Sequence, residues 1–212
     1  MEILYQDARI VVALKPPGVV STDEPGGMPQ LLRQQLNTSC IRTVHRLDQA
    51  AGGVMVFARS HRAAAILSQQ IQARTVEKEY LAVCCGAPRK PSGTFCDLLR
   101  RDRATHRTEV ASEPSKDTRP ASLDYVVLGT AEGLSLVRIR LHTGRTHQIR
   151  VQFASRGLPL AGDRRYGDPD ASFPLALWSC RLRLNHPQSG EMMEFSAPPP
   201  QTYPWNCFQE RM

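Results

Sequence analysis

The sequence lacks the cysteine and histidine spacings that hold a structural metal or a disulfide framework. Its six cysteines stand at positions 40, 84, 85, 96, 180 and 207, and they form no C-x-x-C pair. No histidine lies at zinc-ligand spacing from a cysteine pair, and residues 1–7 do not resemble a signal peptide. We therefore expect free thiols in the reducing cytoplasm, with no metal and no other cofactor.

Long apolar runs are also absent. Arginine and lysine interrupt each apolar stretch well short of the length that a membrane helix needs, so we expect no association with a membrane. The chain has 212 residues, of which 41% are hydrophobic and 22% charged, ordinary values for a globular protein. That length can bury a core without disulfides, and we expect a single domain over residues 1–212, with a division into two lobes left open.

Acidic residues are the scarcer charged class. Asp and Glu total 20 against 27 Lys and Arg, which gives a net charge of +7, and most of the cations are arginines. Guanidinium groups bind phosphates through two hydrogen bonds and stack on bases. Each neutralised phosphate also releases counterions, so the excess of positive charge favours a nucleic-acid partner. Many proteins of other classes are mildly basic, and the charge alone does not decide between them.

Short apolar runs separated by turn residues predict interspersed strands and helices. Ile3–Gln6 and Ile10–Lys15 are expected to pair as a β-hairpin. Ser60 is the expected N-cap of a helix that extends to about Ala73 and buries Ala63, Leu67 and Ile71. Further strands are expected at 54–57, 79–85, 122–128, 134–141 and 191–195, and further helices at 31–36 and 146–155.

Two segments show no clear periodicity. Residues 86–120 are rich in Gly, Pro, Arg and Asp and predict a long irregular excursion, and the proline-rich residues 197–204 predict a surface tail. Hairpins mixed with helices indicate an α+β fold with a mainly antiparallel sheet rather than a doubly wound parallel one.

Three polar segments carry the residue types of an active site. Asp48 follows Arg46 in a glycine-containing loop, and a nearby cation keeps such a carboxylate ionised. Tyr80 lies at the start of a predicted strand, and residues 143–150 bring several donor side chains to a predicted helix start. Taken singly, each segment has a plainer explanation, as a turn aspartate, a half-buried strand tyrosine or a solvated helix start.

Together, and in this order, the segments resemble the RluA-type pseudouridine synthase family. The matches are H-R-L-D at 45–48, K-x-Y at 78–80, T-G-R-T-H-Q-I-R at 143–150 and L-A-G-D-x-x-Y-G at 160–167. The resemblance begins at the opening strand with K-P-P-G at 15–18 and reaches about Pro198. The chain departs from the family at three places, where Ala51-Gly52-Gly53 stands for Thr-Ser-Gly, Gln152 for a histidine and Trp178-Ser179-Cys180 for Leu-His-Ala.

The resemblance implies the pseudouridine synthase fold, a mixed and mainly antiparallel central sheet flanked by helices and loops, with an active-site cleft across the sheet. It places the catalytic aspartate on Asp48, the active-site tyrosine on Tyr80 and the basic partner of the aspartate on Arg150. Arg46 falls on the arginine that enters the RNA stem where the target uridine is flipped out. The other residues expected to bind the substrate are His45, Arg145 and His147.

The implied reaction breaks the N1–C1′ bond of a uridine, turns the uracil and rejoins it through C5. Asp48 would start it as a nucleophile at C1′ or as a base at C2′, and the sequence leaves both routes open. Tyr80 would pack on the uracil and help to remove the C5 proton. The target base must leave its stack, at a cost of a few kcal/mol, and Arg46 would fill the vacated space.

Two other functions have to be weighed. A catalytically inactive RNA-binding protein could keep this fold, although Asp48, Tyr80 and Arg150 are all present. A nucleoside or glycoside hydrolase would need a second carboxylate near Asp48, and no paired-carboxylate motif is visible.

The expected partner is structured RNA, a stem-loop of tRNA or ribosomal RNA. The first expected strand begins at residue 2 or 3, so we expect no separate N-terminal RNA-binding module and recognition by the domain's own surface. Four alternating arginines would follow phosphates or form a merely solvated face: Arg138, Arg140, Arg181 and Arg183. We expect a monomer with no obligate protein partner.

Overall fold

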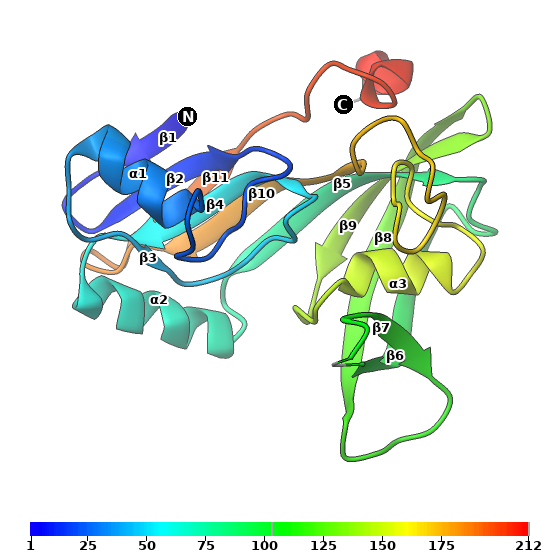
Figure 1. Ribbon diagram of the computed structural model, residues 1–212, viewed down its shortest axis with the longest axis horizontal. Helices are drawn as coiled ribbons and strands as arrows, with labels where there is room; N and C mark the ends of the chain where they lie inside the picture. Colours follow the sequence, from blue (N-terminus) through cyan, green and yellow to red (C-terminus); the bar gives the residue numbers. More distant parts are fainter. Residues whose placement is uncertain (103, 212) are drawn as a thin grey trace. The chain divides into compact units, whose positions relative to one another are not determined.

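The computed structural model describes residues 1–102 and 104–211, and the chain divides into two compact units (Figure 1). The first unit comprises Met1–Glu79 and Trp178–Pro199, and the second comprises Tyr80–Leu177 and Pro200–Met212. The chain therefore passes between the units three times, within β5 (Glu77–Cys85), at the start of β10 (Leu177–Asn185) and after Pro199.

The first unit is built on a mixed sheet. Its strands run in the order β1 (Ile3–Gln6), β2 (Ile10–Lys15), β4 (Gly52–Ala58) and β10, with β3 (Arg42–Thr43) beside β4 and β11 (Met192–Ser196) beside β10. β4 and β10 are parallel, and the other pairs are antiparallel. The predicted hairpin of β1 and β2 is confirmed at both of its strands.

Two helices accompany this sheet, α1 (Met28–Leu36) and α2 (His61–Gln72). The hydroxyl of Ser60 accepts the N–H of Ala63 at 3.1 Å, so the predicted N-cap of α2 is confirmed. Ala63 and Leu67 are buried, and Ile71 is only half-buried. The helix packs on alternate residues of three strands, which form one apolar core: Ile10, Val12, Val54, Val56, Leu182 and Leu184.

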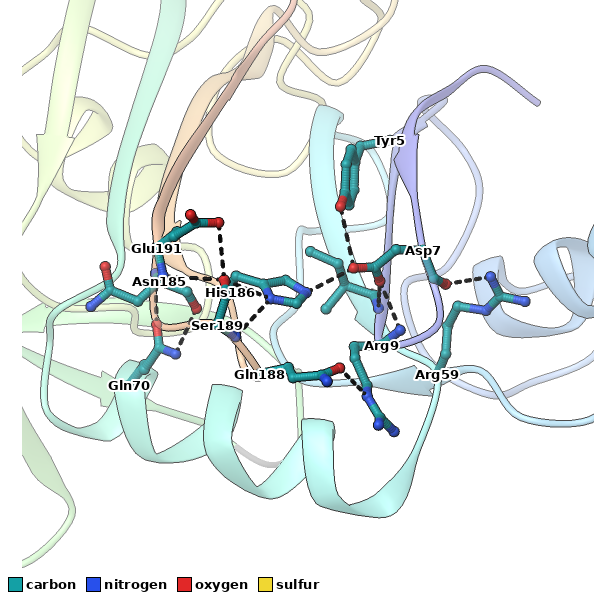
Figure 2. A network of polar contacts seen from close by, with 11 residues as sticks. Tyr5, Asp7, Arg9, Arg59, Gln70, Asn185, His186, Gln188, Ser189 and Glu191 are labelled. Atoms are coloured by element: carbon teal, nitrogen blue, oxygen red, sulfur yellow. Dashed lines mark hydrogen bonds and ion pairs between the residues drawn. The ribbon is translucent and has the colours of Figure 1, made fainter.

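A polar network joins the β1–β2 turn to the β10–β11 turn (Figure 2). The Asp7 carboxylate accepts the N–H groups of Arg9 and Ile10 at 2.7 Å and lies 2.8 Å from Nε2 of His186. Nδ1 of His186 accepts the N–H of Ser189 at 3.2 Å. These contacts fasten two turns that lie far apart in the sequence, and we assign them to the architecture of the first unit.

The second unit contains an antiparallel sheet in the order β9 (Leu134–Leu141), β8 (Thr118–Ala131), β6 (Ser92–Arg101) and β7 (Thr108–Ala111). Helix α3 (Gln148–Ala154) and the 3-10 helix η1 (Trp205–Arg211) complete it. The rings of Phe95, Tyr125 and Phe153 meet in its core at centroid distances of 4.7 to 6.0 Å. With the parallel pair in the first unit, the predicted α+β fold with a mixed and mainly antiparallel sheet is confirmed.

The prediction of an irregular excursion over residues 86–120 is wrong. That segment contains β6, β7 and the start of β8, and β6 pairs with β8 from Ser92 to Arg100. Within β6 only Phe95 and Leu99 are buried, because most other side chains of this strand face solvent. The alternation of apolar and polar residues that marks a half-buried strand is therefore weak in the sequence.

Two segment boundaries also differ from expectation. Helix α3 begins at Gln148 rather than at residue 146. His147 has a left-handed φ of 55°, so it cannot be part of a right-handed helix. The predicted surface tail over residues 197–204 is not wholly on the surface, since Ala197 and Pro199 are buried in the first unit and Pro204 is buried in the second. In the described part of the chain, no helix has the length and apolar character to cross a membrane.

Candidate active site

Asp48 lies in a loop of the first unit between β3 and β4 and is half-buried. Leu47, the residue before Asp48, forms two hydrogen bonds with the hydroxyl of Ser21. The hydroxyl accepts the N–H of Leu47 at 3.1 Å and donates to the carbonyl of Leu47 at 2.8 Å. The carbonyl of Asp48 accepts the N–H of Ala51 at 3.0 Å, which closes the turn into β4. The backbone on both sides of the carboxylate is therefore fixed.

Lys15 anchors the same loop from the K-P-P-G segment. Its side chain is fully buried, and Nζ donates to the carbonyls of Pro16 at 3.0 Å, Val19 at 2.6 Å and Gln49 at 3.0 Å. Burial lowers the pKa of Lys15 to about 8, and the negative charge of Asp48 acts in the opposite direction. A lysine whose three donors are all used thus fixes the residue directly after Asp48.

The two basic residues of the H-R-L-D motif have different environments. His45 is buried, and its Nε2 accepts the N–H of Val56 at 3.1 Å, so the proton of the neutral ring is on Nδ1. Burial, and then the charge of Lys78, lower the pKa of His45 to about 3, which keeps the ring neutral. Arg46 is exposed. The structure gives His45 an internal contact with β4, and its predicted role in substrate binding stays a prediction.

Arg150 lies in the interior of the second unit on α3. Its Nε and Nη2 donate to the two carboxylate oxygens of Asp163, each at 2.8 Å, and both side chains are buried. Burial alone would raise the pKa of Asp163, but hydrogen bonds and charge from Arg150, with two backbone N–H groups, outweigh it and lower the pKa. The cation of Arg150 is therefore held by a fork-on-fork ion pair.

Gln148 shapes the turn that precedes Arg150. Its Oε1 accepts the hydroxyl of Thr143 at 2.8 Å and the N–H of Arg145 at 3.1 Å, and its Nε2 donates to the carbonyl of Ser122 at 3.1 Å. Arg145 is half-buried and donates through Nε to the carbonyl of Pro120 at 3.1 Å. His147 is also half-buried, and its Nδ1 lies 2.8 Å from the hydroxyl of Tyr166.

Tyr80 is the first residue of the second unit and is buried in β5. The structure brings His45, Arg46 and Asp48 together in one loop of the first unit, and Arg145, His147 and Arg150 around the start of α3 in the second. The pairing of Asp48 with Arg150 and the action of Tyr80 on the same base stay predictions.

Sequence reasoning assigned no role to three residues that position these groups. Lys15 holds the Asp48 loop, Asp163 pairs with Arg150, and the ring of Tyr166 lies 5.1 Å from Cζ of Arg150. The motifs K-P-P-G and L-A-G-D-x-x-Y-G were the available signals, since they contain all three residues. Among the described residues, no three side chains of the His, Cys, Asp and Glu types gather to hold a metal ion.

Two departures from the family pattern meet in the first unit. Trp178 pairs with Gly52 across the parallel strands, and a Cβ added at Gly52 would lie 2.4 Å from Cζ3 of the Trp178 ring. Gly53 has a φ of 119°, and a Cβ there would lie 2.3 Å from the carbonyl oxygen of Ser179. The Trp178 ring thus occupies the space that a side chain at position 52 would need, at a position where the family often has serine.

Comparison with known proteins agrees with this geometry. Residues 9–155 match the sequence profile of a family described as RNA pseudouridylate synthase. The chain is 35% identical to a Bacillus subtilis protein named uncharacterized RNA pseudouridine synthase YhcT, over 209 residues, which are 94% of this chain and 69% of that protein. It is also 35% identical to the dual-specificity RNA pseudouridine synthase RluA of Escherichia coli over 210 residues, 92% of each chain.

A solved structure shares the fold. The human protein named RNA pseudouridylate synthase domain containing 1 superimposes with a TM-score of 0.81 at 26% identity, over 95% of this chain and 84% of that one. At that coverage the match extends into both units of the chain. The chain therefore belongs to the RNA pseudouridylate synthase family, in its RluA-type branch, and is an isomerase that converts uridine in RNA to pseudouridine.

Proposed function

We propose that this enzyme modifies a uridine in a stem-loop of tRNA or ribosomal RNA, with Asp48 as the essential carboxylate. The observation that carries the proposal is the loop of Asp48, whose backbone is fixed by Ser21 and Lys15. The substrate class is supported by two relatives. RluA of Escherichia coli is named a dual-specificity enzyme, and a 35% identical protein of Nitrosomonas europaea is named ribosomal large subunit pseudouridine synthase D.

The first step of the proposed reaction breaks the N1–C1′ bond, and its electron pair leaves with the uracil. In one route Asp48 attacks C1′ and forms an ester, which C5 of the turned uracil then displaces. In the other route Asp48 removes the C2′ proton, and that proton returns when C5 adds to C1′. Both routes end with loss of the C5 proton and protonation of N1, so the product is an isomer of the substrate.

Arg150 and Tyr80 complete the proposed site. Nε and Nη2 of Arg150 donate to the carboxylate of Asp163. Because a guanidinium has five N–H donors, Arg150 can also bind a second carboxylate through Nη1. We assign that second carboxylate to Asp48. Tyr80, which is only 6% exposed, would present its ring to the uracil and its phenol to the C5 proton.

The test is to express the wild type and Asp48→Asn in cells that lack their own copy of the enzyme. Pseudouridine in total tRNA and ribosomal RNA is then mapped by carbodiimide labelling. Asp23→Asn is the matched control, since Asp23 is an exposed aspartate of the same unit paired with Arg33. We expect a site that is present with the wild type and with Asp23→Asn but absent with Asp48→Asn.

Other outcomes would point to other functions. Sites unchanged by Asp48→Asn, in a folded protein that binds RNA, would leave Asp48 without a catalytic role. Release of free uracil from nucleosides would indicate a hydrolase. Deuterium at C2′ of the target uridine separates the two routes, because it slows single-turnover formation of pseudouridine only where the C2′ proton is removed.

The proposal includes a monomer that works in the cytoplasm without an obligate protein partner. The six cysteines are all free thiols, and a reducing compartment keeps them so.

A further inference from the structure

The β6–β7 connection of the second unit, taken with the end of β6, is basic. Residues 100–107, which we call the basic turn, begin with the last two residues of β6 and contain four arginines and a single acidic residue, Asp102. Nε of Arg100 donates to the carboxylate of Glu109 at 2.9 Å, so the charge of this arginine is already paired. Asp102 is used within the turn, where it accepts the N–H of Ala104 at 2.7 Å and the hydroxyl of Thr105 at 2.8 Å. Arg101 and Arg107 are exposed. The exposed guanidinium groups of Arg101 and Arg107 are suited to the phosphates of an RNA backbone.

Tyr166 ties the end of the basic turn to the segment after α3. Its hydroxyl accepts the N–H of Thr108, the first residue of β7, at 2.9 Å. Next to Tyr166, Arg165 donates through Nη1 to the carbonyl of His106 at 2.8 Å. Thr108 is buried, so its N–H needs a partner inside the protein, and the phenol of Tyr166 supplies it.

The same tyrosine reaches the environment of Arg150. Because its hydroxyl accepts from Thr108, its own proton is available to Nδ1 of His147, which lies 2.8 Å away. The N–H of Tyr166 donates to Asp163, the partner of Arg150, at 3.1 Å. Cζ of Arg150 lies 5.1 Å from the centre of the Tyr166 ring, and Cζ of Arg107 lies 5.3 Å from it, both within cation–π range.

We infer that Tyr166 is a positioning residue that couples the basic turn to Arg150. Its hydroxyl fixes the turn for RNA binding, and its ring, with its N–H on Asp163, fixes the guanidinium of Arg150 for the chemical step. The inference rests on the proposed function in one respect, since it takes Arg150 to act in the reaction. Tyr166 lies beyond residue 155, outside the part of the chain that the family profile matches.

Two substitutions separate the two roles. Tyr166→Phe removes the hydroxyl and keeps the ring, and Tyr166→Leu removes both. Tyr125→Phe is the matched control, because it removes another hydroxyl of the same unit, one that donates to the carbonyl of Lys90 at 3.4 Å. Three quantities are measured: amide exchange of peptides that cover residues 102–110, the Kd for total tRNA, and the single-turnover rate at saturating RNA.

For Tyr166→Phe we expect faster exchange in residues 102–110 and a Kd raised about 3- to 10-fold, the size of one lost hydrogen bond. Its single-turnover rate should stay within about twofold of the wild type, a change too small to signal a lost hydrogen bond. Tyr166→Leu should lower that rate at least about tenfold, the effect of about 1.4 kcal/mol. Tyr125→Phe should leave all three quantities unchanged.

Unchanged exchange and Kd in Tyr166→Phe would overturn the inference, as would faster exchange with an unchanged Kd. An equal loss of rate in Tyr166→Phe and Tyr166→Leu would overturn the division between hydroxyl and ring. If Tyr166→Leu does not fold, Tyr166→Phe still decides, because the ring that packs near Leu99 and Val151 is kept. Failure of the proposed function would appear in a different experiment, the pseudouridine mapping with Asp48→Asn. The amide exchange and Kd measurements on Tyr166→Phe would still test whether its hydroxyl fixes the basic turn.

Discussion

Burial fixes the protonation of His45. The ring accepts the N–H of Val56 through Nε2, and its Nδ1 has no hydrogen-bond partner among the described residues. A charged ring would put a buried cation there, and the charge of Lys78 adds to that cost. Charging this histidine is therefore coupled to unfolding of the loop that precedes Asp48.

We predict that the free energy of unfolding falls as the pH falls below about 6.5, the ordinary pKa of histidine in an unfolded chain. Because the pKa of folded His45 is lowered to about 3, the unfolded state binds one more proton between these two values. The expected slope is about 1.4 kcal/mol per pH unit. His45→Gln keeps an acceptor for Val56 and should flatten the slope in urea titrations at pH 7 to 4.5. An equal slope in both proteins would contradict the assignment.

The pair of Gly52 and Trp178 gives a second prediction for single residues. Gly52→Ser should lower the free energy of unfolding by about 1–3 kcal/mol, because its Cβ would overlap the indole ring. In a Trp178→Leu background the same change should cost clearly less, since the ring is gone. Chemical denaturation of the four proteins forms a double-mutant cycle. Strictly additive effects would show that the two positions are independent.

Among the secondary-structure elements, the first unit followed its sequence pattern closely, and the second followed it at β9, whose predicted bounds 134–141 are confirmed, but not at β6 and β7. The hairpin of β1 and β2 and the cap of α2 were predictable because alternation and Ser60 are strong local signals. Strands β6 and β7 were missed because only Phe95, Leu99 and Thr108 of their side chains are buried, and because the strands are held by backbone pairing, β6 with β8 and β7 with β6. Pairing between distant segments leaves little local signal.

The features of the candidate site likewise fall into those that a local sequence motif predicts and those that depend on contacts between distant residues. The motifs around Asp48 and Arg150 are contiguous in the sequence and could be found by resemblance. The partnership of Arg150 with Asp163 spans 13 residues and depends on where the chain returns after α3, which no local pattern specifies. The same applies to Lys15, which reaches across 34 residues to the carbonyl of Gln49.

For the loop that contains Asp48, we predict that Lys15→Met lowers the free energy of unfolding by about 3 kcal/mol or more, because three backbone carbonyls lose the donor that Nζ supplies. The pKa of folded Lys15 is lowered to about 8, so the unfolded state binds more protons between about pH 8 and 10.4. The contribution of Lys15 to stability should therefore rise with pH in that window.

Thermal and urea unfolding of the wild type and Lys15→Met at pH 7 to 10 would measure both effects. Lys116→Met, at an exposed lysine, is the control and should change neither the stability nor its pH dependence. A loss for Lys15→Met no larger than that of the control would mean that the carbonyls find other donors.

Across the whole molecule, the positive charge is not equally available to RNA. Arg181 lies 3.1 to 3.9 Å from the carboxylates of Glu77, Glu79 and Glu194, so its charge is largely neutralised within the first unit. Arg138 is exposed on β9, and its side chain forms no hydrogen bond or ion pair with the residues that the structure describes. The four alternating arginines identified in the sequence are therefore not equivalent.

We predict that the Kd for RNA rises about 10- to 100-fold between 50 and 200 mM salt, as for a few phosphate contacts. Arg138→Ala should reduce the slope of log Kd against log salt by about one, if Arg138 contacts a phosphate. Arg181→Ala should leave the slope unchanged. Filter binding at four salt concentrations measures all three proteins. Equal slopes for Arg138→Ala and the wild type would assign Arg138 to a merely solvated face.

The discontinuity of the first unit has a consequence for how the protein is made. β4 pairs with β10, and the ribosome completes Glu79 roughly a hundred residues before it reaches Trp178, a delay of about 5–20 s at ordinary rates of translation. The second unit is nearly contiguous over Tyr80–Leu177 and can form while the first still lacks two strands. The nascent chain thus carries the exposed edge of β4 throughout that interval, so the sheet that is begun first waits longest for its remaining strands and is open to mispairing in the meantime.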